Sequence, residues 1–147
     1  MKTWKDALLI TVTLVLVMAV GVFLVLAEPP VRYRIEYYSD DNNYVTVTGT
    51  VSYLKYSDDG ERLFLSFDDL SVAFQESTFV IEGENLRLLQ QNGIDKKMKL
   101  GTQVTFISAT RVFWDGYDMP IVGLSVNGES LLEFENGKVN LLALLKE

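Results

Sequence analysis

Residues 44–56 read YVTVTGTVSYLKY and carry the strongest indication of the fold class. From position 45 to position 51, valine or glycine stands at every odd position and threonine at every even one. This period of two predicts a long β-strand with one buried face. Beyond Gly49 the pattern changes, because Tyr53, Leu54 and Tyr56 cannot all lie on one side of a regular strand. A bend or bulge associated with the glycine would explain the change.

The residues that follow predict a hairpin. Residues 57–60 (SDDG) are typical of a hairpin turn in which the glycine takes a positive φ. In the returning strand at 62–68, we expect Leu63, Leu65 and Phe67 to face the interior. The outward positions of that strand are Arg62, Phe64, Ser66 and Asp68.

One short helix and more strands are expected further along. After a third strand at 78–82, residues 84–92 (ENLRLLQQN) predict a two-turn helix, and Gly93 suits the left-handed position that follows a helix. Asn127-Gly128 is a strong signal for a two-residue hairpin turn. The remaining strands are expected at 101–107, 120–126 and 131–134.

The order of these elements resembles the OB-fold, a five-stranded Greek-key β-barrel with a helix between the third and fourth strands. The resemblance covers about residues 44–134 and depends on the element order, the bend near Gly49 and the helix at 84–92. Residues 31–37 alternate apolar and charged side chains and are expected to form either a short extra strand or an extended stalk. That strand and the C-terminal hairpin and helix depart from the OB-fold pattern, so a different small β-barrel or sandwich stays open. The leucines of the terminal helix, 139–147, are expected to close the open end of the barrel, or else to meet a partner or the membrane interface.

Residues 7–27 (ALLITVTLVLVMAVGVFLVLA) contain no charged side chain. As a helix they would cover roughly 31 Å, enough for the hydrocarbon core of a bilayer. We expect an uncleaved anchor, because the apolar region of a secretory signal is shorter; a signal cleaved after Ala27 is the alternative. The expected organisation is a tail (1–6), a transmembrane helix (7–27), a linker or extra strand (28–43) and a barrel domain (44–147).

Basic residues flank both ends of the apolar segment: Lys2 and Lys5 on one side, Arg32 and Arg34 on the other. Their numbers are equal, so the positive-inside rule gives no orientation by count. Lys2 and Lys5 stand closer to the segment. We therefore expect a single-pass protein of the cytoplasmic membrane with its C-terminal domain outside the cytoplasm.

Composition excludes several kinds of chemistry. The chain has 147 residues, 13 Lys plus Arg, 20 Asp plus Glu, and neither His nor Cys. Thiolate and imidazole metal sites, cysteine nucleophiles and histidine-based triads are therefore impossible. Beyond residue 27 the net charge is −8, which argues against a nucleic-acid partner. With no catalytic or nucleotide-binding motif, we expect no enzyme activity, cofactor or metal site.

The candidate binding surface is an aromatic segment at 111–120 (RVFWDGYDMP). It falls between the fourth and fifth barrel strands, in a loop that helps to form the ligand face of OB-folds. Aromatic rings beside an arginine stack on sugars, hold a peptide or anchor a protein partner. The alternative is a hairpin whose aromatic side chains cap the barrel end. The predicted binding residues are Arg111, Phe113, Trp114 and Tyr117, with Tyr53 and Tyr56 of the first strand on the same face.

Two functional hypotheses follow. The first is a membrane-anchored, non-catalytic module whose OB-like domain recognises a protein or a glycan, with the lipid bilayer as its other partner. The second is a structural or assembly subunit of a membrane complex, in which the apolar helix and the C-terminal helix make the main contacts.

Overall fold

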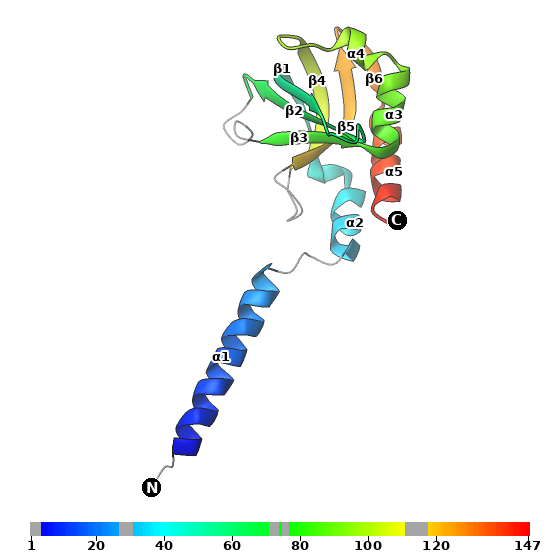
Figure 1. Ribbon diagram of the computed structural model, residues 1–147. Helices are drawn as coiled ribbons and strands as arrows, with labels where there is room; N and C mark the ends of the chain where they lie inside the picture. The colour runs from blue at the N-terminus through cyan, green and yellow to red at the C-terminus, as the bar shows by residue number, and fades with distance from the viewer. Residues whose placement is uncertain (1–3, 27–30, 71–73, 75–76, 111–117) are drawn as a thin grey trace.

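Six β-strands form one sheet, and five of them close into a barrel (Figure 1). The computed structural model describes residues 4–26, 31–70, 74, 77–110 and 118–147, and in the first helix it describes the side chains of Trp4 and residues 10–23. The strands are β1 (Tyr44–Tyr56), β2 (Arg62–Asp68), β3 (Thr78–Glu82), β4 (Gln103–Ala109), β5 (Asp118–Val126) and β6 (Glu129–Leu132). The helices are α1 (Trp4–Leu26), α2 (Val31–Ser39), the 3-10 turn η1 (Asp41–Asn43), α3 (Gly83–Gln91), α4 (Ile94–Lys97) and α5 (Phe134–Leu144).

The sheet order is β3-β2-β1-β4-β5-β6, and a parallel pairing between β3 and β5 closes the barrel. The extra strand, β6, follows β5 through the predicted Asn127-Gly128 turn, where both residues have a positive φ. Helix α3 lies between β3 and β4 in the chain, at the place that the OB-fold pattern gives to its helix. The protein therefore has an OB-like small barrel, as its sequence predicts.

β1 belongs to both halves of the barrel, because its first half pairs with β4 and its second half with β2. A bulge lies between Val51 and Tyr53, and the extra residue reverses which side chains point inward. Val51, before the bulge, is buried; Leu54 and Tyr56, after it, pack against the same core. The predicted irregularity is confirmed, and it begins two residues after Gly49.

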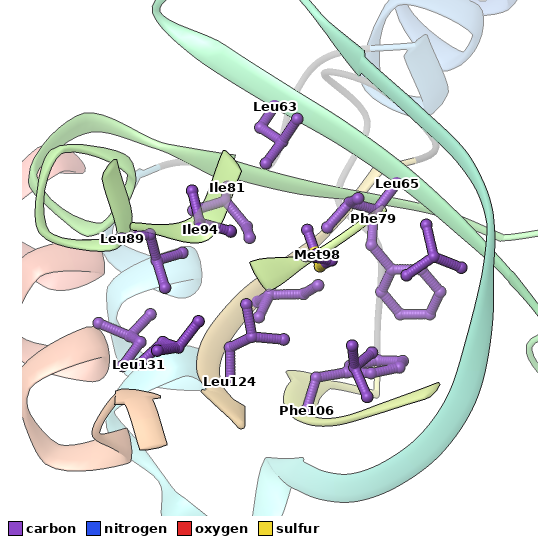
Figure 2. Packing of buried hydrophobic residues seen from close by; sticks show 14 of the residues in the cluster. Leu63, Leu65, Phe79, Ile81, Leu89, Ile94, Met98, Phe106, Leu124 and Leu131 are labelled. Carbon is purple, nitrogen blue, oxygen red and sulfur yellow. The ribbon is translucent and has the colours of Figure 1, made fainter. Parts of the chain in front are cut away.

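Phenylalanine rings fill the middle of the barrel. Phe67 stacks on Phe106 with ring centroids 4.4 Å apart, and Phe79 meets the two rings edge-on at 5.4 and 4.9 Å. Leu63 and Leu65 are buried, as the alternation in their strand predicts. The same core receives Leu89 from α3, Ile94 from α4 and Leu131 from β6 (Figure 2).

A second, smaller apolar cluster lies on the outer face of β5, under α2 and α5. β5 directs Ile121 into the barrel and its neighbour Val122 to the outside, where Val122 meets Tyr38 and Leu141. The terminal helix begins at Phe134 rather than near residue 139. It packs on the side of the barrel, so the expectation that its leucines close the barrel end is wrong.

The extra strand expected at 31–37 is also wrong, because these residues belong to α2. An alternation over only seven residues does not distinguish a strand from a helix. In a helix, the same sequence places Arg34 and Tyr38 one turn apart on one side. Two of the last backbone carbonyls of α2 accept hydrogen bonds, from Asn43 Nδ2 at 2.8 Å and from the Tyr44 hydroxyl at 2.9 Å. These tertiary contacts favour the helix over its local strand pattern.

The first helix, α1, runs over 23 residues, and its described side chains from Ile10 to Phe23 are exposed. Across the described part of the chain, no helix reaches the length and apolarity that crossing a membrane requires. The membrane span expected at 7–27 therefore has no support in the fold and stays a prediction.

Candidate functional site

The loop that the sequence favours as the binding surface lies outside the described residues. β4 ends at Ala109 and β5 begins at Asp118, so the chain is described on both sides of it. The predicted binding residues in that loop are Arg111, Phe113, Trp114 and Tyr117.

Tyr53 and Tyr56 are described, and the structure does not bring them together. They stand three positions apart in β1, so their side chains leave opposite faces of the strand. Tyr53 is 45% exposed on the outside of the barrel. Tyr56 packs against the core, and its hydroxyl donates a 2.5 Å hydrogen bond to Asp95 of α4. Of the two, only Tyr53 is available to a ligand.

The surface around Tyr53 continues across β2. Side chains of paired residues in antiparallel strands share one side of the sheet, and here Tyr53 pairs with Ser66 and Lys55 with Phe64. The guanidinium carbon of Arg62 lies 5.9 Å from the centre of the Phe64 ring. We call these five residues the outer β1–β2 face.

The outer β1–β2 face combines flat apolar surface with cations and hydroxyls. Tyr53, Lys55 and Arg62 are exposed, and Phe64 and Ser66 are half-buried. Helix α5 packs on β5, on another side of the barrel, and α3 contacts β3, β6 and β2 (Figure 1). In OB-folds the face of the second and third strands and the loop after the first strand take part in ligand binding, and β2 contributes Arg62, Phe64 and Ser66 to the outer β1–β2 face. In the sequence, this face is indicated by Phe64, which the predicted strand at 62–68 directs outward.

Arg62 connects this face to an open cleft of about 420 Å³. The cleft lies between the β1–β2 turn and α3, and Arg62 and Glu82 line it together with Leu86 and Arg87. Arg62 and Glu82 are paired in register across β2 and β3. The volume is within the range of small-ligand sites, so the cleft extends the surface that a partner can contact.

A smaller cavity of about 100 Å³ lies between α2, β3, β5 and α5. Its charged lining residues are Arg34, Arg62, Glu82 and Asp118. A space of this size holds a few water molecules rather than a sugar ring. We therefore interpret this cavity as a polar contact region that holds the side chain of Arg62 in place, next to the binding surface and not part of it.

The residues predicted to flank a membrane are in different surroundings. Arg32 is exposed on α2, whereas Arg34 is half-buried and lines the small cavity. Lys2 lies outside the described residues, and the side chain of Lys5 is not described.

Within the described ranges, no group of three or more acidic, histidine or cysteine side chains is placed to hold a metal ion. The outer β1–β2 face contributes two cations, two aromatic rings and two hydroxyls, which suits recognition by stacking and hydrogen bonding. Comparisons with protein-family models, curated proteins and solved structures found no match to this chain.

Proposed function

We propose that this protein is a membrane-anchored, non-catalytic binding module that recognises a protein or glycan partner with its OB-like barrel. The outer β1–β2 face carries the proposal. Tyr53 is exposed beside Phe64, and Lys55 and Arg62 supply hydrogen-bond donors on the same side. Tyr and Arg are enriched among residues that dominate binding energy at interfaces, and exposed rings also stack on sugar faces.

Replacing Tyr53 tests the binding role, because an exposed ring contributes little to folding. In Tyr53→Ala we expect partner affinity to fall by about tenfold, which corresponds to more than 1 kcal/mol. The free energy of unfolding should change by less than about 0.5 kcal/mol. Thr46→Ala, an exposed position in the other half of β1, is the matched control.

The partner is obtained by photo-crosslinking the full chain in native membranes and by glycan-array binding. A photoreactive residue at position 53 should give a defined adduct that the same residue at position 46 does not give, or Tyr53→Ala should remove a glycan signal. Equal adducts at both positions, together with no glycan signal that depends on Tyr53, would exclude this face.

The membrane part of the proposal is supported by the composition of the first helix. Residues 7–27 have no charged side chain, and the described side chains of α1 are exposed and almost all apolar. Such a surface is unfavourable in water, and a bilayer would remove it from water. We place the N-terminus in the cytoplasm and the barrel outside the cytoplasmic membrane. Recovery of the protein in the carbonate-resistant membrane fraction tests the anchor. Digestion of the barrel by protease added to intact cells tests its position outside the cytoplasm.

The second candidate, an assembly subunit of a membrane complex, is favoured by exposed apolar side chains outside the barrel, Val31 and Tyr33 on α2 and Val139 on α5. Removing residues 1–27 separates the two candidates. Partner binding that the truncated protein retains favours the binding module, whereas loss of assembly on truncation favours the assembly role.

A further inference from the structure

We propose that the first turn of α2 contacts the lipid headgroups and holds the barrel at a fixed position on the membrane surface. The contacting residues are Val31, Arg32 and Tyr33. This inference depends on the proposed anchoring by α1, and it assigns a lipid surface to a part of the protein outside that anchor.

The exposure pattern of α2 separates its first turn from the turns that pack against the barrel. Val31 and Tyr33 are 49% and 60% exposed, and Arg32 is exposed between them. Further along the helix, Tyr38 is 4% exposed in the small cluster under α2 and α5, and Arg34 lines the small cavity. The first turn is therefore an apolar, aromatic and basic surface that the barrel does not cover.

The residue types of this turn suit the boundary between lipid and water. Tyrosine is enriched at that boundary, where its ring stays apolar and its hydroxyl stays hydrated. Arginine near the end of an apolar helix attracts lipid phosphates. Glu36, one turn further along α2, is also exposed. Its charge would be repelled by anionic headgroups, so we limit the contact to the first turn.

The chain length between α1 and α2 keeps the turn close to the bilayer. Four residues separate Leu26 from Val31. Five Cα–Cα steps span at most about 19 Å. The turn therefore lies within reach of the headgroup region when α1 occupies the hydrocarbon core.

α2 is fixed to the barrel, so its contact with lipid would orient the whole domain. The Tyr37 hydroxyl and Thr110 Oγ1 share a 2.7 Å hydrogen bond. Asn43 and Tyr44 bond the last carbonyls of α2. The end of α5 lies beside α2 (Figure 1), and the small cluster joins the two helices.

A single cysteine can report each position, because the chain has none of its own. We would label Val31→Cys, Val17→Cys and Leu100→Cys with an environment-sensitive fluorophore, in the full chain, in vesicles of phosphatidylcholine and phosphatidylglycerol. Leu100 is the matched control, because it is apolar, 67% exposed and follows α4, at the end of the barrel away from α2 (Figure 1).

We expect lipid-bound nitroxides at headgroup depth to quench position 31, nitroxides at mid-bilayer depth to quench position 17, and neither to quench position 100. Quenching at 17 without quenching at 31 would overturn this inference and leave the anchor standing. No quenching at 17 would contradict the anchor itself.

Charge reversal tests the role of the basic side chain. Arg32→Glu in the Val31→Cys chain should weaken the headgroup contact by about fivefold for each unit of charge changed, and most strongly in anionic vesicles. Lys96→Glu, an equal change on α4, should leave quenching unchanged. Equal losses of quenching in both variants would reject the lipid assignment. So would a fluorophore at position 31 that reports an apolar environment in the absence of lipid, because a second copy of the chain would then cover that position.

Discussion

Tyr56 connects the barrel wall to the helices that close one end of it. Its hydroxyl donates a 2.5 Å hydrogen bond to Asp95 of α4. Burial, followed by this hydrogen bond and by the negative charge of Asp95, raises the pKa of Tyr56 from its ordinary value of 10.0 to about 12. The folded protein therefore favours the neutral phenol.

We expect the protein to lose stability as the pH rises between the ordinary pKa of tyrosine, 10.0, and the folded-state pKa of about 12. In this window the unfolded chain releases the Tyr56 proton and the folded chain keeps it, so alkali favours unfolding. Below the window both states hold the proton, and the contribution to stability is complete.

Urea unfolding at a series of pH values measures this effect. Tyr56→Phe should give a shallower decrease of unfolding free energy with pH than the parent chain, whereas Tyr53→Phe should follow the parent. Burial and the neighbouring Tyr38 also raise the pKa of Tyr44, so part of the decrease should remain in Tyr56→Phe. If the unfolding free energy of Tyr56→Phe falls with pH as steeply as that of the parent chain, then burial and the Asp95 contact do not raise the pKa of Tyr56 in the folded protein.

At the scale of elements, the docking of α5 on β5 depends on a close backbone approach. A Cβ at Gly137 would lie 1.8 Å from the carbonyl oxygen of Val122, closer than any non-bonded pair tolerates. The Gly137 carbonyl also accepts a 2.9 Å hydrogen bond from Asn85 Nδ2 of α3, and Asn140 Nδ2 donates to Asn85 Oδ1 at 2.9 Å. Three elements thus meet at this glycine.

Gly137→Ala should lower the free energy of unfolding by about 3 kcal/mol, because α5 must move away from β5 to admit a methyl group. The measurement is urea unfolding followed by circular dichroism. Val139→Ala, an exposed position on the same helix, is the control and should stay within about 0.5 kcal/mol of the parent. A Gly137→Ala protein as stable as the control would mean that α5 does not pack this closely.

The strands could be predicted from the sequence because their signals are local. Leu63 and Leu65 point inward as their alternation predicts. α2 could not be predicted in the same way, since contacts such as the Tyr37–Thr110 hydrogen bond join residues 73 positions apart. The odd spacing of Tyr53 and Tyr56 already places them on opposite faces of β1. Which of the two faces the core depends on where the bulge falls, and alternation alone does not fix that position.

The same reason limits what the sequence reveals of the binding surface. The pattern in the strand at 62–68 correctly directs Phe64 outward. Its position next to Tyr53 depends on the register between β1 and β2, which only the paired strands establish. The residues at 111–117 lie outside the described part of the chain, so their role stays a prediction.

At the scale of the whole molecule, the protein has two apolar clusters with different tasks. The larger one fills the barrel, and the smaller one fastens α2 and α5 to the outer face of β5. Tyr38 belongs to the smaller cluster and is 4% exposed. Val122 and Ile121 are neighbours on opposite faces of β5, and β4 likewise contributes Phe106 to the larger cluster and Ala109 to the smaller one. The two clusters therefore share these two strands and no side chains.

This separation predicts that α2 can be loosened without opening the barrel. Tyr38→Ala removes a buried aromatic side chain, and such changes cost about 3 kcal/mol or more. Hydrogen exchange should accelerate in α2 and α5, while β1 and β2 keep their protection, since the stacked phenylalanines of the barrel are unchanged. Tyr33→Ala, on the exposed side of the same helix, should leave exchange unaltered. Uniform acceleration across all strands in Tyr38→Ala would instead mean that the two clusters unfold as one unit, and the orientation of the barrel would then depend on its whole core rather than on α2.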